Sequence, residues 1–231
     1  MQAVILAAGM GTRMGELTRN TPKPLLKIQD RTLLEHNLTA MPDEIDEVIL
    51  VVGYLADQIK SAIGENFLGK KITYVSQTEL KGTGHALSLC KGMLKNHFLV
   101  IMGDDLYYEK DLKALTKHHL ATLVWEVTEA DFATKQQAGI VKVDEKMDIL
   151  GITERQTLTA GALVNAGAYI INTDYFNYPL VSAGNPATEY GLPQTFMQMV
   201  NGSKIKAVKA EWWHKVATPE DLQLNGNHKA K

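Results

Sequence analysis

The sequence has little cysteine, no excess of positive charge and no long apolar run. A single cysteine, Cys90, among 231 residues cannot form a disulfide within the chain, and no Cys/His spacing suggests zinc. The 24 basic and 26 acidic residues give a formal net charge of −2, so no basic surface predicts nucleic-acid binding. The apolar run at the N-terminus is too short to span a membrane or to serve as a signal peptide. The cytoplasm is therefore the expected location, with neither nucleic acid nor a membrane as a partner.

The first 28 residues combine an apolar strand, a glycine-rich loop and two cations. Residues 3–7 are apolar and partly β-branched, which is typical of a short strand buried on both faces. In the loop Gly9–Gly15 that follows, glycines let backbone N–H groups approach an anion without a Cβ in the way. Arg13 adds a permanently charged donor fork, and Lys23 lies between two prolines that stiffen its backbone. This arrangement suits a polyphosphate, although such loops also occur in α/β proteins that bind nothing.

Two common nucleotide-binding motifs are absent from this loop. A dinucleotide-binding fingerprint requires a third glycine where this chain has Met14, and a Walker loop requires a Gly-Lys-Ser/Thr run that the chain lacks here. The loop is therefore neither that of a standard dehydrogenase nor that of a P-loop NTPase.

Strands and helices alternate in the first half at the spacing of a doubly wound parallel sheet, and the length suits one large domain. The pattern predicts strands at 3–7, 47–52, 71–76 and 98–102, and helices at 32–41, 55–64, 86–94 and 111–120. Further strands are expected at 121–128, 139–144, 149–154, 165–172 and 204–210, and a helix from Thr188 to about Val200. Because the strands between residues 121 and 172 lack intervening helices, this part predicts an antiparallel or mixed extension of the sheet.

Ligands of doubly wound sheets bind at the carboxyl ends of the strands, so the residues that follow each strand are candidates for a site. Gln77 follows the strand 71–76, and its amide carries both an acceptor and donors, the complement of a pyrimidine edge. Asp104 and Asp105 follow the strand 98–102 after a glycine, where a carboxylate can hold Mg²⁺ against phosphate oxygens. Taken alone, the loop after Gln77 also fits a plain helix entry, and the aspartates also fit a helix cap.

Together with Pro22-Lys23-Pro24-Leu25-Leu26, the glycine loop resembles the signature LAAG-x-GTR-x(n)-PKPL of the sugar-1-phosphate nucleotidyltransferases, or nucleotide-sugar pyrophosphorylases. The chain is similar to short single-domain uridylyl- and thymidylyltransferases acting on glucose-1-phosphate or N-acetylhexosamine-1-phosphate. The resemblance implies a Rossmann-like α/β domain with a doubly wound, mixed, mostly parallel sheet, without the C-terminal β-helix of long relatives. It implies transfer of a nucleotidyl group from an NTP to a sugar-1-phosphate, giving an NDP-sugar and pyrophosphate, with Mg²⁺ as cofactor. UTP is the first choice of nucleotide, because Gln77 is followed by GTGHA, and dTTP is the second.

The same resemblance assigns roles to individual positions. It implies that Arg13, Lys23 and Asp104 are catalytic and that Asp104 binds the metal, while His85 is interpreted as structural. The nucleotide-binding positions are Leu6, Ala8, Gly9, Gly11, Thr12, Gln77, Gly82 and Thr83. The sugar-phosphate-binding positions are Gly139, Glu154, Arg155, Asn165 and Lys215. The chain then divides into a nucleotide-binding half (about 1–120), a sugar-phosphate-binding half (about 121–225) and a flexible tail (226–231).

One position departs from the family pattern. In the closing motif W-x-D-[IV]-G-T-P-E-D-L, the aspartate that usually completes the metal site is Lys215 here. Either Lys215 stands in for a cation beside the phosphates, or His214 or a water completes the site, or catalysis is impaired and the chain is a nucleotide-sugar-binding regulator. Retained activity is favoured, because the other charged positions are present. A further alternative is a cytidylyltransferase acting on a non-sugar phosphate such as inositol phosphate or phosphocholine. Assembly into a homo-oligomer is left open.

Overall fold

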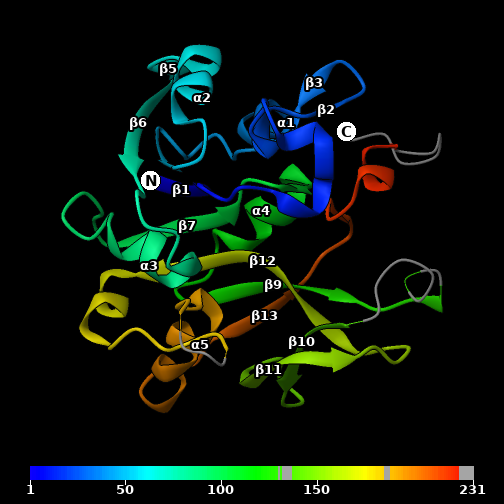
Figure 1. Ribbon diagram of the computed structural model, residues 1–231. Coiled ribbons are helices and arrows are strands. Elements are labelled where there is room, and N and C mark those ends of the chain that lie inside the picture. Colours follow the sequence, from blue (N-terminus) through cyan, green and yellow to red (C-terminus); the bar gives the residue numbers. More distant parts are fainter. Residues whose placement is uncertain (130, 132–136, 185–187, 224–231) are drawn as a thin grey trace.

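The computed structural model describes residues 1–129, 131, 137–184 and 188–223. Its first strand, β1 (Gln2–Ala7), lies inside a ten-stranded sheet (Figure 1). β1 pairs in parallel with β4 (Glu47–Val52) on one side and with β7 (His97–Met102) on the other. Beyond β4, β6 (Lys70–Ser76) continues the parallel series, and the short β5 (Asn66–Phe67) ends that edge in antiparallel pairing. The apolar N-terminal run thus forms a strand buried on both faces, as predicted.

Successive residues of β1 pack into two different cores, because the side chains of a strand point alternately to opposite faces. Ala3 and Ile5 belong to one apolar cluster, whereas Val4 and Leu6 belong to another. The helices that contribute to the first cluster are α1 (Leu33–Thr39), α2 (Ala56–Ile63) and α4 (Glu109–Leu115), and those of the second are α3 (Gly82–Ser88) and α5 (Leu192–Phe196). Helices therefore cover both faces, which confirms the doubly wound arrangement.

Antiparallel strands extend the sheet in the second half of the chain. β12 (Leu163–Asn172) runs antiparallel to β7, and it also pairs with β9 (Ala121–Glu126). β10 (Gln137–Val143) pairs with β11 (Ile149–Thr157) and touches β12, while β13 (Lys206–Lys209) lies parallel to β9. The predicted mixed, mostly parallel α/β sheet is confirmed, and the residues that the structure describes form no β-helix.

Short ribbons and 3-10 turns lie outside the main sheet. β2 (Lys27–Ile28) pairs with β3 (Arg31–Thr32), and β8 (Asp105–Tyr107) pairs with β14 (Trp213–Lys215). The 3-10 turns are η1 (Thr12–Thr18), η2 (Lys23–Leu25), η4 (Thr173–Asn177), η5 (Met197–Asn201) and η6 (Pro219–Leu222). The β8–β14 ribbon matters for function, because it brings the end of the described chain beside the turn that follows β7.

Several helix boundaries differ from the sequence predictions. The helix expected over 111–120 is α4, which ends at Leu115. The helix expected from Thr188 begins only at Leu192, because Tyr190 N donates a hydrogen bond to the carbonyl oxygen of Lys81 and holds the preceding segment extended. The helix expected over 86–94 is α3, which ends at Ser88, so Cys90 is fully buried but lies in the following turn. The capping box predicted at the start of α1 is present. None of the helices within the described ranges could span a bilayer, and the predicted tail 226–231 lies outside those ranges.

Candidate functional site

A cavity of about 380 Å³ opens where β1, β6 and β7 reach their carboxyl ends. All eight positions that were assigned to the nucleotide line it: Leu6, Ala8, Gly9, Gly11, Thr12, Gln77, Gly82 and Thr83. Lys23 and Asp104 line it as well. Sequence reasoning missed other lining residues, among them Met10, Leu80 and Glu189. Glu189 had no local signal, because it reaches the cavity only through the packing of its segment against the start of α3.

The glycine loop is held in shape by its own turn and by Lys23. Gly11 has a left-handed φ of 66°, and a Cβ added there would lie 2.9 Å from the Cβ of Lys23. The carbonyl oxygen of Gly11 accepts hydrogen bonds from Met14 N at 2.9 Å and from Thr18 Oγ1 at 3.0 Å. The close packing explains why glycine is required at this position. A second cavity of about 260 Å³ adjoins the first, and it is lined by Gly11, Thr12, Arg13, Met14, Lys23, Asp104 and Ala217.

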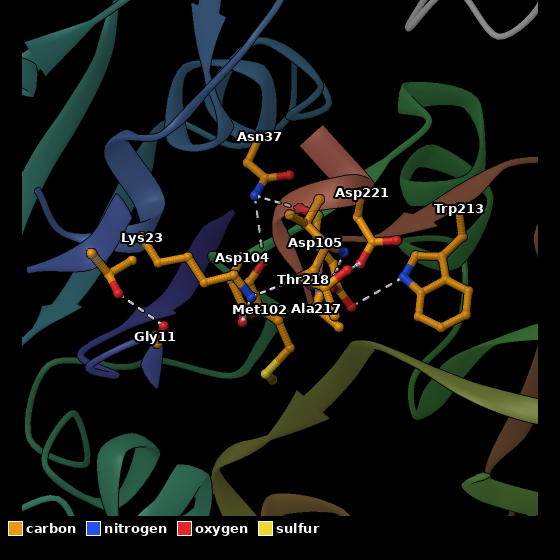
Figure 2. A network of polar contacts seen from close by, with 12 residues as sticks. Gly11, Lys23, Asn37, Met102, Asp104, Asp105, Trp213, Ala217, Thr218 and Asp221 are labelled. Carbon is orange, nitrogen blue, oxygen red and sulfur yellow. Dashed lines mark hydrogen bonds and ion pairs between the residues drawn. The ribbon is translucent and has the colours of Figure 1, made fainter. Parts of the chain in front are cut away.

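Lys23 and Asp104 form an ion pair at the border of the two cavities (Figure 2). Lys23 Nζ lies 2.6 Å from Asp104 Oδ2 and also donates to the carbonyl oxygen of Val216. The Lys23 side chain is only 9% exposed, whereas that of Asp104 is 44% exposed. The lysine is therefore a fixed charge, and the carboxylate remains accessible to a ligand.

A buried network beneath this pair fixes the turn that carries Asp104. Asn37 Nδ2 donates to the carbonyl oxygens of Asp105 at 2.9 Å and Met102 at 3.4 Å, on either side of Asp104 (Figure 2). The carboxylate of Asp105 accepts hydrogen bonds from Trp213 Nε1 at 3.2 Å and from the backbone N–H of Val216 at 3.3 Å. Burial raises the pKa of Asp105, the neighbouring Asp104 raises it further, and Lys215 opposes the change. Asp105 is thus a buried structural carboxylate rather than a second open ligand.

Lys215 lies on β14 directly opposite Asp105 on β8. Paired residues of an antiparallel ribbon share one face, so the lysine side chain is on the Asp105 side of the ribbon. His214 is on the other face, because side chains alternate along a strand, and its Nε2 lies 2.7 Å from the carbonyl oxygen of Asp221. The ring of His214 also stacks on Trp212. His214 therefore has a structural environment away from Lys215.

The described residues assigned to the sugar phosphate line neither of the two cavities, and two of them lie against each other. Gly139 on β10 adjoins Glu154 on β11, since a Cβ at Gly139 would lie 2.7 Å from Glu154 Oε1. Asn165 shapes a bulge in β12 by accepting from Gly167 N at 3.1 Å and donating to Tyr169 Oη at 2.6 Å. Arg155 lies in β11, and its side chain is outside what the structure describes.

A single carboxylate of the described residues faces both cavities. No group of three or more His, Cys, Asp or Glu side chains that could hold a metal occurs in the described ranges. Asp104 Oδ2 is engaged by Lys23, and the described residues give its Oδ1 no hydrogen-bond partner. One carboxylate oxygen is thus open at the place where both cavities meet.

Comparison with known proteins identifies the relationship behind this geometry. A family model described as nucleotidyl transferase matches residues 2–227. The chain belongs to this family. The bifunctional protein GlmU of Methanocaldococcus jannaschii is 30% identical over 223 residues, which are 96% of the chain and 52% of GlmU. The chain therefore spans about half the length of the GlmU relatives that it matches. The resemblance to sugar-1-phosphate nucleotidyltransferases is confirmed.

Two further relatives have lengths closer to that of this chain. The D-glycero-alpha-D-manno-heptose 1-phosphate guanylyltransferase of Campylobacter jejuni is 34% identical over 178 residues, covering 77% of the chain and 78% of the relative. The UTP–glucose-1-phosphate uridylyltransferase AglF of Haloferax volcanii is 26% identical over 226 residues, covering 96% of the chain and 93% of the relative.

Solved structures of this nucleotidyl transferase fold superpose closely on the chain. A Bacillus anthracis protein with the provisional name glucose-1-phosphate thymidylyltransferase gives a TM-score of 0.82 at 20% identity, with coverage of 96% and 92%. The inositol-1-phosphate CTP transferase from T. maritima gives 0.79 at 20% identity, with coverage of 96% and 91%. At these identities the likeness establishes the fold alone.

Proposed function

We propose that the chain transfers a nucleotidyl group from a nucleoside triphosphate to a sugar-1-phosphate and releases pyrophosphate. The observation that carries the proposal is the convergence of all eight nucleotide-assigned positions on one cavity, with Lys23 and Asp104 at its border. Membership of the nucleotidyl transferase family supports it, as do the names of the uridylyl- and guanylyltransferase relatives. Because such enzymes act on small phosphorylated metabolites, a cytoplasmic location is part of the proposal.

The reaction needs little proton transfer, so positioning and charge dominate. An oxygen of the sugar-1-phosphate, already ionised at neutral pH, forms a bond to the α-phosphorus in line with the departing group. The bond between the α-phosphorus and the bridging oxygen breaks, and pyrophosphate leaves with the electron pair. Lys23 and Arg13 border the second cavity, where they neutralise the charge on the α-phosphoryl group and the pyrophosphate. The backbone of the glycine loop orients the triphosphate.

Mg²⁺ is the expected cofactor, and the residues present fit it. Magnesium prefers oxygen ligands and is commonly held by one or two carboxylates together with waters and substrate phosphates. Asp104 offers an accessible carboxylate at the junction of the two cavities, so it would hold the ion. Asp105 is excluded from this role, because its oxygens are buried and accept hydrogen bonds from Trp213 and Val216. Bound there, the ion would supply charge neutralisation to the reacting phosphates.

UTP is the proposed nucleotide, with dTTP next. Gln77 lines the cavity, and its amide can pair with the acceptors and the N3–H of uracil or thymine. AglF is named for UTP. A cytidylyltransferase acting on a non-sugar phosphate is the second enzymatic candidate, favoured by the fold of the inositol-1-phosphate CTP transferase. A non-catalytic nucleotide-sugar sensor is the third candidate, and it rests on Lys215 in place of the usual aspartate.

Pyrophosphate release tests the three candidates together. The protein is assayed with Mg²⁺ and each of UTP, dTTP, CTP, ATP and GTP, against sugar-1-phosphates, inositol phosphate and phosphocholine. We expect release that requires both UTP and a sugar-1-phosphate and that is lost in Asp104→Ala but kept in the exposed-site control Asp43→Ala. Release only with CTP and a non-sugar phosphate supports the second candidate. Binding of UTP without release from any pair overturns the enzymatic proposal.

A further inference from the structure

Two groups in α3, near its N-terminal end, hold the side-chain amide of Gln77. Gln77 is 4% exposed and lines the larger cavity. Its Nε2 lies 3.1 Å from the carbonyl oxygen of Gly82 and 3.1 Å from Nδ1 of His85. No local sequence pattern connects His85 with this amide, which lies eight residues earlier in the chain.

These two contacts fix which end of the amide faces the cavity. A carbonyl oxygen can only accept, so the amide atom beside Gly82 must be the NH₂ group. Its second hydrogen then points to His85 Nδ1, which accepts, and the ring hydrogen of the neutral imidazole is on Nε2. The described residues give Gln77 Oε1 no hydrogen-bond partner, and this atom is not among the buried side-chain oxygens without one. Oε1 is therefore open to the cavity as a pure acceptor.

The backbone around Gly82 cannot easily rotate to change this arrangement. Gly82 has a left-handed φ of 85°, and a Cβ there would lie 2.5 Å from the carbonyl oxygen of Tyr190. Tyr190 in turn donates its N–H to Lys81 O and accepts from Gly84 N, both at 2.8 Å. The carbonyl that orients Gln77 thus belongs to the first residue of α3, and the residues on both sides of it are hydrogen-bonded to Tyr190.

We propose that His85 is a positioning residue that sets base selectivity, because it keeps Gln77 from offering a donor to the nucleotide. Where Oε1 faces the Watson–Crick ring nitrogen rather than an exocyclic amino group, it favours bases whose ring nitrogen carries hydrogen, namely uracil, thymine and guanine. Cytosine and adenine present a bare ring nitrogen, and its lone pair repels Oε1. The inference rests on the proposed nucleotide role of the cavity and narrows its substrate class to UTP, dTTP or GTP.

Equilibrium binding of size-matched nucleotide pairs tests this independently of turnover. Calorimetry compares UTP with CTP and GTP with ATP, first for the wild-type protein. One well-placed base contact discriminates by roughly 10- to 100-fold, so UTP and GTP are expected to bind that much tighter than their partners. Equal or reversed affinities in both pairs overturn the inference. Failure of the proposed function is distinguishable, since it is absence of pyrophosphate release even where these affinities differ.

Two substitutions separate orientation of the amide from simple packing. His85→Leu fills a similar space but accepts no hydrogen bond, so the UTP-to-CTP affinity ratio is expected to fall about tenfold, the worth of roughly one hydrogen bond. His85→Asn keeps an acceptor, because the Oδ1 atom of asparagine is bonded to Cγ as the Nδ1 atom of histidine is. This variant is expected to restore the ratio. Thermal melting checks that both variants fold. An unchanged ratio in folded His85→Leu, or a ratio in His85→Asn as low as in His85→Leu, contradicts the inference.

Discussion

The proposed nucleotide cavity and the residues proposed to bind the sugar phosphate are built in different ways. Gly9, Gln77 and Asp104 follow the carboxyl ends of β1, β6 and β7, and parallel pairing brings these ends together at one cavity. Glu154 and Asn165 lie inside the strands β11 and β12, where their neighbours are other side chains of the sheet. In the first region, the order of the parallel strands places the groups that face a ligand. In the second region, the positions of the side chains depend on strand register and on a bulge in β12. Substitutions in the first region should therefore affect binding and reaction of the nucleoside triphosphate. Substitutions in the second region should affect binding of the sugar-1-phosphate.

The largest effect is expected at Lys23. Lys23→Met removes the charge that joins Asp104 to the carbonyl oxygen of Val216, so kcat for pyrophosphate release should fall on the order of 100- to 1,000-fold. Lys27→Met is the matched control, because Lys27 is an exposed lysine on the nearby β2. Rates are measured at saturating substrates, with circular dichroism to confirm folding. Wild-type kcat in a folded Lys23→Met protein would remove Lys23 from the phosphate site.

Substitutions at two glycines of the loop, Gly11 and Gly9, distinguish an effect on loop folding from an effect on the approach of the ligand. Gly11→Ala places a Cβ 2.9 Å from Lys23 at a left-handed φ, so it should lower both NTP affinity and Tm, the latter by about 2–4 °C. A Cβ at Gly9 would meet nothing within 4 Å, so Gly9→Ala should leave Tm unchanged. If the backbone at Gly9 approaches a phosphate of the NTP, the KM of the Gly9→Ala variant for NTP should still rise. Unchanged KM for NTP in both variants would place the triphosphate away from this loop.

The sugar-phosphate region is tested at Gly139. Gly139→Ala must displace the Glu154 carboxylate, because the new Cβ would lie 2.7 Å from Oε1. We expect KM for the sugar-1-phosphate to rise roughly tenfold, about the worth of one hydrogen bond, with KM for NTP unchanged. Gly151→Ala on β11 is the matched control, since a Cβ there meets nothing within 4 Å. A rise in KM for NTP instead would mean that the two regions are not separate.

The contrast between the regions also explains what sequence reasoning could reach. The central strands and the two-sided helix cover followed from apolar runs, and the rule that ligands bind at strand ends indicated Gln77 and Asp104. Most of the other cavity-lining positions followed only from the resemblance to the family. The β8–β14 ribbon was not predicted, because its two strands of three residues have no periodicity and pair across more than a hundred positions. The structural role of Asp105 and the contact between His85 and Gln77 were also missed. Both depend on side-chain orientation, which no local pattern encodes.

The smallest effect is expected at Asp148, beside β11 in the second region. The ammonium groups of Lys206 and then Lys204, which form ion pairs with Asp148, lower the pKa of this carboxyl below its ordinary value of 3.8. A carboxyl with a depressed folded pKa stabilises the fold above its ordinary pKa, and this contribution is lost as pH falls through the folded value. Asp148→Asn should therefore lower Tm at neutral pH by no more than about 3 °C, because the two partner lysines remain open to solvent that screens the pair.

The pH dependence of this difference distinguishes charge from shape. The Tm values of wild type and Asp148→Asn should converge as pH falls below 3.8, because the wild-type carboxyl then becomes protonated and loses its attraction to Lys206. Asp43→Asn is the control, since Asp43 is exposed. NTP affinity should not change in either variant, because neither residue lines the cavity. A Tm difference that persists at acid pH would indicate that Asp148 acts through packing. Weakened NTP binding in Asp148→Asn would mean that the ion pairs of Asp148 also influence the nucleotide cavity.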